Sequence, residues 1–251
     1  MTACPFIEAD WPAPPGVHAL TTLRHGAGVS KPPFDTFNMG LRNGDALADA
    51  LENRRQLGGL LGLPSAPRWL RQVHGTRAMY FDDASEAGDE PEADAAVTDT
   101  RGVVLAILTA DCLPVVFAAR DGAEIAAAHA GWRGLAAGVL EVTLSAMKTA
   151  PRDVIAWLGP AAGPQAYEIG AEVRDALVGG DADAEAAFTA TRPGHWKVDL
   201  YALARRRLAA AGMAPADIHG GDRCTIREAD AFFSHRRDGI GGRIATLAWL
   251  A

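Results

Sequence analysis

The sequence feature that most constrains the fold is an Asp-Gly pair, Asp121-Gly122, which lies between two apolar runs. The runs cover residues 113–119 and 124–128, and Asp-Gly is a strong signal for a two-residue turn between antiparallel strands. A continuous apolar run at 103–108 predicts a further buried strand just before them. We therefore expect a β-hairpin in this part of the chain.

Helical and strand-like segments alternate along the rest of the chain. Apolar residues recur with helical spacing over residues 45–61. The same reasoning predicts further helices at 135–148, 171–177 and 200–211, and further strands at 17–22, 154–158 and 243–250. Because helices interleave with strands while one strand pair is a hairpin, we expect a mixed sheet in a single α/β (α+β) domain spanning residues 1–251.

Three short segments complete the expected organisation. Trp69-Leu70 is interpreted as strand. The acidic tracts 82–94 and 179–185 are interpreted as solvated surface loops, since clustered carboxylates favour water.

Charge and composition exclude several functional classes. The net charge of −7 argues against a general nucleic-acid binder, which normally carries a basic face. No run approaches the 18 or more apolar residues of a membrane span, and the start of the chain lacks the features of a signal peptide. The three cysteines are an odd, widely spaced set, which does not indicate a disulfide framework. We expect a cytoplasmic monomer that acts on a small molecule.

The hairpin sets the relation between Cys112 and His129. Counting pairs outward from the Asp-Gly turn puts His129 opposite Pro114 and Cys112 opposite Gly131. Opposed residues share a face of the sheet, as do residues two apart on one strand. Cys112 and His129 are therefore expected to point to the same side as diagonal neighbours, roughly 7 Å apart at Cα.

A cysteine and a histidine in this relation have three interpretations. They can be a nucleophile and its base, two ligands of a metal ion, or ordinary structural residues. His74, beside Gly75, is a third candidate ligand, although the spacing alone does not bring it to the hairpin. Two imidazoles and one thiolate suit a catalytic zinc ion with its fourth position open, and copper would accept the same ligands.

Other residues are candidates for binding an anion. Arg133 lies between two glycines at an expected helix start, and Arg236 and Arg237 follow His235 near glycines. A guanidinium group can hold a phosphate or carboxylate through two parallel hydrogen bonds. Asp111 is expected to point away from Cys112 in a regular strand and so to act behind the ligands. The sequence contains neither a Gly-x-Gly-x-x-Gly motif nor a Walker loop.

Several segments resemble one protein family over essentially the whole chain. They are Gln72-Val73-His74-Gly75, Thr109-Ala110-Asp111-Cys112-Leu113-Pro114-Val115 and Ala128-His129-Ala130-Gly131-Trp132-Arg133-Gly134, followed by Phe232-Phe233-Ser234 and Arg236-Arg237-Asp238. Near the start, Asn38-Met39-Gly40 also matches, whereas Arg24 to Ser30 carries one residue more than the family pattern. The family has been called multicopper polyphenol oxidase or laccase-domain protein, purine nucleoside phosphorylase and peptidoglycan editing factor.

This resemblance implies a fold similar to the catalytic domain of cytotoxic necrotizing factor, with layered mixed sheets and helices. It also implies a zinc ion bound by His74, Cys112 and His129. The implied activity is phosphorolysis of adenosine, inosine and methylthioadenosine, with deamination of adenosine as a side activity.

Two other activities use the same three ligands. One is an amidase-type removal of L-serine from a UDP-muramoyl precursor, and the other is copper-dependent phenol oxidation. For the leading hypothesis, we expect the substrate and phosphate to be held by residues among Arg24, Asn38, Arg133 and Arg236.

Overall fold

The expected hairpin is present, in the expected register. In the computed structural model, which describes residues 4–83, 88–179 and 181–251, β6 (Leu113–Ala119) pairs antiparallel with β7 (Ile125–Ala130), and Pro114 lies opposite His129. The turn itself differs from the prediction, because the amide of Gly122 donates to the carbonyl of Ala119. The turn therefore covers residues 119–122, with Gly122 in the left-handed region at φ 73°.

The hairpin forms the centre of a six-stranded mixed sheet. Its order is β12-β8-β6-β7-β4-β3, with parallel pairs at both edges and antiparallel pairs between them. The other four strands are β3 (Ala78–Tyr80), β4 (Ala95–Thr98), β8 (Val154–Leu158) and β12 (Ile218–Gly220). The prediction of a mixed sheet is thus confirmed.

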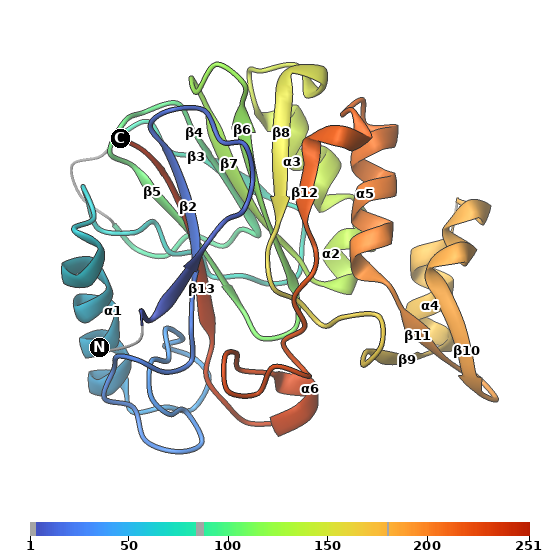
Figure 1. Cartoon of the computed structure of the whole chain (residues 1–251), viewed down its shortest axis with the longest axis horizontal. Helices are drawn as coiled ribbons and strands as arrows, with labels where there is room; N and C mark the ends of the chain where they lie inside the picture. Colours follow the sequence, from blue (N-terminus) through green and yellow to red (C-terminus); the bar gives the residue numbers. More distant parts are fainter. Residues whose placement is uncertain (1–3, 84–87, 180) are drawn as a thin grey trace.

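A second, four-stranded sheet packs on the first (Figure 1). Its order is β1-β2-β13-β5, all antiparallel, with bounds Phe6–Glu8, Val17–Thr22, Ile244–Leu250 and Val104–Thr109. Apolar side chains of both sheets form one buried cluster that includes Leu105, Ile107, Val116, Ile125 and Trp157. This sheet-on-sheet core holds β5, β6 and β7 rigidly, and these strands lead into the site described below.

Helices cover the outer faces of both sheets, giving four layers (Figure 1). Helix α1 (Leu47–Leu61) packs on the four-stranded sheet through Leu57, while α2 (Trp132–Ala137), α3 (Val139–Ala146) and α5 (Leu200–Ala210) pack on the six-stranded sheet. A single helix was expected over residues 135–148. Gly138 divides it, because its left-handed backbone at φ 96° ends α2 before α3 begins.

A smaller three-stranded sheet forms a lobe at the right of Figure 1. It contains β10 (Phe188–Arg192), β11 (His195–Val198) and β9 (Glu168–Gly170), with α4 (Ala171–Val178) alongside. Helix α6 (His235–Asp238) and three short 3₁₀ helices complete the described elements. The 3₁₀ helices are η1 (Pro151–Asp153), η2 (Ala182–Ala187) and η3 (Pro215–Asp217).

Three interpretations of short segments need correction. Trp69-Leu70 is not a strand but lies between isolated bridges at Arg68 and Arg71. The second acidic tract contains η2 rather than a plain loop, and its residue 180 lies outside the described residues. In the first tract, residues 84–87 also lie outside them, and its last residue, Asp94, is fully buried instead of solvated.

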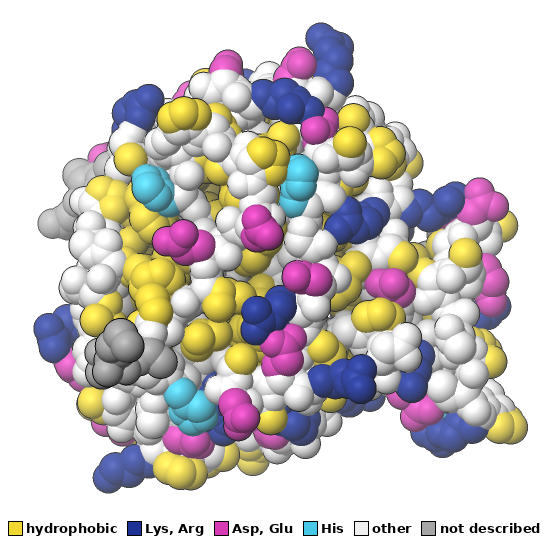
Figure 2. Space-filling model, in the orientation of Figure 1, with side chains coloured by type: hydrophobic (Ala, Val, Ile, Leu, Met, Phe, Trp, Pro, Cys, Tyr) yellow, Lys and Arg dark blue, Asp and Glu magenta, His cyan; other side chains and the backbone are white. Residues whose placement is uncertain are grey.

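Acidic and basic side chains are interspersed on the face shown in Figure 2, without a continuous basic area there. This pattern agrees with the net charge of −7. Among the described helices, none has the length and apolar character needed to cross a membrane. All three cysteines are free thiols.

Candidate metal centre and anion-binding pocket

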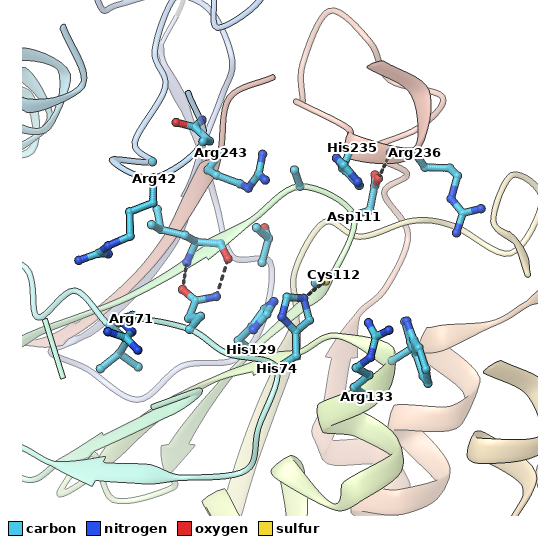
Figure 3. A pocket seen from close by; sticks show the side chains of 18 of the residues that line it. Arg42, Arg71, His74, Asp111, Cys112, His129, Arg133, His235, Arg236 and Arg243 are labelled. Atoms are coloured by element: carbon cyan, nitrogen blue, oxygen red, sulfur yellow. Dashed lines mark hydrogen bonds between the residues drawn. The ribbon is translucent and has the colours of Figure 1, made fainter. Parts of the chain in front are cut away.

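Three side chains from separate parts of the chain converge at one end of the hairpin. His74, Cys112 and His129 each offer a donor atom, and these atoms all lie within 4.8 Å of one another. The Cys112 Sγ is 3.7 Å from the His74 Nε2, and the two imidazole rings meet edge to face (Figure 3). The described residues contain no other group of three or more such donors.

The hairpin positions two of these side chains. His129 lies in β7 opposite Pro114, and Cys112 directly precedes β6. The residue before it, Asp111, has a left-handed backbone at φ 91°, which is rare for a residue other than glycine. The chain therefore enters β6 through a sharp turn rather than as a regular strand, and Cys112 sits at that turn.

Asp94 connects the third side chain to the hairpin, and the sequence did not reveal this role. Its Oδ1 lies 2.8 Å from the Nδ1 of His129, and its two oxygens also accept the amides of Val73, His74 and Gly75 at 2.7–3.2 Å. Three consecutive amides on one carboxylate fix the loop in which His74 adopts a left-handed backbone at φ 61°. One buried carboxylate thus orients both histidines.

Gln72 anchors the same loop from its other end. Its side-chain amide donates to the carbonyl of Leu108 and accepts from the amide of Leu108, each at 2.8 Å. This bridge ties the loop to β5. The loop that carries His74 is therefore held by side chains, although it contains no regular secondary structure of its own.

The absence of a side chain at Gly131 lets the backbone pass close to two of the donors. A Cβ added to Gly131 would lie 2.7 Å from the His74 ring and 3.0 Å from the Cys112 Sγ. Because Asp94 engages the Nδ1 of His129, the Nε2 of that ring is the atom available as a ligand. The donor set fits a metal ion held by two nitrogens and one sulfur.

The negative charge of Cys112 and the positive charge of His129 stabilise each other. Burial by itself raises the pKa of the Cys112 thiol, but the nearby His129 charge and hydrogen bonds from both imidazoles lower it to about 6. Burial likewise lowers the pKa of His129, but the Cys112 thiolate and Asp94 raise it to about 9. In the metal-free protein these residues therefore form a thiolate–imidazolium pair, and metal binding must displace the imidazolium proton.

A pocket of about 520 Å³ opens over the three donors. Arg42, Arg71, Arg133, Arg236 and Arg243 line it, together with His235, Tyr167 and Trp132. Arg42 and Arg71 pair with Glu90 and Glu92, respectively. Among the described residues, no carboxylate lies within ion-pair distance of Arg133, Arg236 or Arg243, so these three arginines of the pocket have no ion-pair partner.

Comparison with known proteins identifies the family of the chain. The family model of the multi-copper polyphenol oxidoreductase laccases matches residues 18–251. The chain belongs to this family. A relative from Xylella fastidiosa, named purine nucleoside phosphorylase, is 58% identical, with 97% of this chain and 96% of the relative covered.

Two further relatives match the chain over nearly its whole length. The purine nucleoside phosphorylase YfiH of Escherichia coli is 49% identical, with 98% of each chain covered. The crystal structure of a Neisseria meningitidis protein superposes with a TM-score of 0.92 at 45% identity, covering 98% of this chain and 99% of the other. The layered mixed α/β architecture is thus a property of the family, whereas the expected likeness to cytotoxic necrotizing factor stays a prediction.

Of the four residues expected to contact substrate, two line the pocket of this family member. Arg133, on α2, stacks over Trp132, and Arg236, on α6, stacks over Tyr167. Arg24 is not among the lining residues, and it bonds Asp35. Asn38 is fully buried beneath the pocket.

Asp111 connects Cys112 to the Arg236 side of the pocket. Its carboxylate accepts the Thr225 hydroxyl at 2.7 Å and the Arg236 amide at 2.6 Å. As expected from the sequence, it acts behind Cys112 and is not part of the donor cluster. The Arg236 side of the pocket and the donor cluster are therefore linked through Asp111.

Replacing Asp94 with asparagine should weaken metal binding. One carboxylate oxygen of Asp94 would become an NH₂ group, which cannot accept from the backbone amides or His129 that now bond to that oxygen. Buried N–H groups would then be left unpaired. Loss of such a partner to a ligand typically costs about 10–100-fold in metal affinity. We expect this loss for Asp94→Asn in a Zn²⁺ titration against a competing chelator. Asp99→Asn, just beyond β4 and paired with the exposed Lys148, is the matched control; equal affinities in the two variants would contradict the role of Asp94.

The lowered pKa of Cys112 predicts unusual thiol reactivity in the metal-free protein. Since the thiolate is the reactive form, alkylation should reach half its maximal rate near pH 6 and not change much above pH 7. Iodoacetamide labelling across pH, read peptide by peptide by mass spectrometry, measures this, with the exposed Cys4 as internal comparison. Added Zn²⁺ should protect Cys112 alone. A midpoint near 9 would show that the histidines do not stabilise the thiolate.

Proposed function

We propose that this chain is a zinc-dependent purine nucleoside phosphorylase. It would split adenosine, inosine and methylthioadenosine with phosphate into the free base and ribose 1-phosphate or its methylthio form, and deaminate adenosine as a side activity. One observation carries the proposal: a His-Cys-His donor cluster opens into a pocket with three arginines that have no ion-pair partner among the described residues. The names of the relatives at 58% and 49% identity support it.

Zinc is the metal that the donor set favours. Zinc bonds of about 2.3 Å to sulfur and 2.0–2.1 Å to nitrogen, at tetrahedral angles, put these ligands about 3.6 Å apart. The Cys112 Sγ and His74 Nε2 are 3.7 Å apart without adjustment. Three protein ligands leave a fourth position, as in catalytic zinc sites. Copper accepts the same ligands, so metal analysis is part of the test.

The metal ion and the pocket residues would have separate roles in the reaction. Bound zinc would supply a Lewis acid and a means to activate water in its open position. Arg133 and Arg236 would hold phosphate by charge-assisted hydrogen bonds on one side of the cluster. A phosphate oxygen attacks the anomeric carbon of the ribose, the glycosidic C–N bond breaks, and its electron pair leaves with the purine, which takes up a proton. Asp94 and Asp111 keep the participating groups in position.

Phenol oxidation is less well supported, despite the name of the family model. Reducing oxygen by four electrons normally requires a cluster of copper ions, and so several groups of ligands. Within the described residues, His74, Cys112 and His129 form the single group of three or more such donors. One mononuclear site favours hydrolytic or group-transfer chemistry.

The proposal predicts that purified protein with measured zinc content converts adenosine and phosphate to adenine and ribose 1-phosphate. Chromatography resolves the base, and a coupled assay measures the sugar phosphate. Cys112→Ala removes the thiolate ligand and should lower zinc content and turnover, the latter by at least about 100-fold. Cys4→Ala, which removes an exposed thiol, is the matched control and should keep full activity.

Three outcomes would overturn this proposal. Formation of neither adenine nor inosine by zinc-loaded protein would exclude a purine nucleoside enzyme. Release of L-serine from a UDP-muramoyl precursor carrying serine, without nucleoside turnover, would identify the amidase activity instead. Activity that appears only after copper loading would mark phenol oxidation.

A further inference from the structure

The pocket carries arginines on two sides of the donor cluster. In Figure 3, Arg133 and Arg236 lie on one side of His74 and Cys112, and Arg243, Arg42 and Arg71 lie on the other. A neutral nucleoside and one inorganic phosphate require only one of these sides. The other side therefore needs an explanation of its own.

Arg243 is the fixed cation of this second side. It directly precedes β13, and its Nη1 donates to the carbonyls of Gly241 and Gly242 at 3.0 and 2.9 Å. Its stem packs on Gly40 so closely that a Cβ there would lie 2.9 Å from the Arg243 Cγ. The side-chain oxygen of the buried Asn38 accepts a hydrogen bond from the backbone amide of Arg243 at 2.8 Å, which fixes the backbone from which the Arg243 side chain extends. The guanidinium is thus preorganised at the pocket wall.

Arg243 has no ion-pair partner among the described residues. Burial lowers its pKa, and the more distant charges of Cys112 and Asp111 offset this effect only in part, so the surroundings still disfavour its charge. Cations held away from water are normally paired. Its neighbours Arg42 and Arg71 show the usual solution, since each pairs with a glutamate and remains more than half exposed. The partner of Arg243 is therefore to be sought in a ligand.

We propose that Arg243 forms a second anion subsite, and that the preferred substrate is a nucleoside that carries its own phosphate, a purine nucleoside 5′-phosphate. This inference rests on the proposed function, in which phosphate already occupies the Arg133 and Arg236 side. A phosphomonoester carries nearly two charges and several acceptor oxygens, which suits the fixed guanidinium of Arg243, with Arg42 and Arg71 on the same side of the pocket. Both subsites line one pocket of about 520 Å³, a size suited to a single small molecule with its co-substrate.

Binding to the zinc-loaded full chain tests the inference directly. By calorimetry, adenosine 5′-phosphate should bind about 10–100-fold more tightly than adenosine, as expected for a new charge-assisted contact. Saturating inorganic phosphate should leave this advantage in place, because it occupies the other side. If inorganic phosphate competes with adenosine 5′-phosphate, the pocket has one anion site and the inference is wrong.

Variants assign the effect to Arg243. Arg243→Gln should bring the affinity for adenosine 5′-phosphate down to that for adenosine, while Arg243→Lys should keep part of the difference because it keeps the charge. Arg192→Gln changes the net charge equally at an exposed position in β10 and should keep the full difference. An unchanged ratio in Arg243→Gln, shown by its melting temperature to be folded, would overturn the assignment.

The two proposals can fail separately. If adenosine is split by phosphate but its 5′-phosphate binds no more tightly, the second subsite fails and the proposed function stands. If adenosine is not turned over but its 5′-phosphate binds in a manner that depends on Arg243, the subsite stands and the proposed reaction fails.

Discussion

The site depends on one buried carboxylate. Asp94 has no exposed surface, yet it contacts His129 and the three amides of residues 73–75. Burial raises the pKa of a carboxyl group, but here the hydrogen bonds from His129 and the amides prevail and hold the pKa of Asp94 below its usual value. Ionised Asp94 therefore ties the ring of His129 in β7 to the loop that carries His74, so that the two move as a unit.

The sequence predicts the part of the site that local structure determines. An Asp-Gly turn between apolar runs predicts the pairing of β6 with β7. The turn lies one residue earlier than expected, but the register is unchanged, because the amide of Ala119 still donates to the carbonyl of Glu124. His74 could not be placed in this way. Its position depends on Asp94 and on the bridge from Gln72 to Leu108, contacts between residues 19 to 36 positions apart. Resemblance to a family supplied what local pattern could not.

Asp94 was missed because it ends an acidic tract. In sequence, a run of carboxylates indicates a solvated loop, and no feature of the tract marks one member as buried. What distinguishes Asp94 is its place directly before β4, whose four residues are all buried. The break at Gly138 was missed for a similar reason. The helical periodicity of the sequence continues through this residue, whereas its left-handed backbone divides the helix. Patterns of polarity predict elements well, but they do not reveal where a polar residue finds its partners.

The site accumulates features that reduce the stability of the protein without its ligands. His74 and Asp111 both adopt left-handed backbones, and such conformations cost of order 1–3 kcal/mol each. The pocket adds arginines that no described carboxylate pairs with. In the proposed function, a metal ion at the three donors or an anion at the arginines would offset these costs, because ligands that bind the native state stabilise it. The left-handed backbones at the donors and the arginines without ion pairs are therefore two features of one pocket, and the proposed ligands would stabilise both.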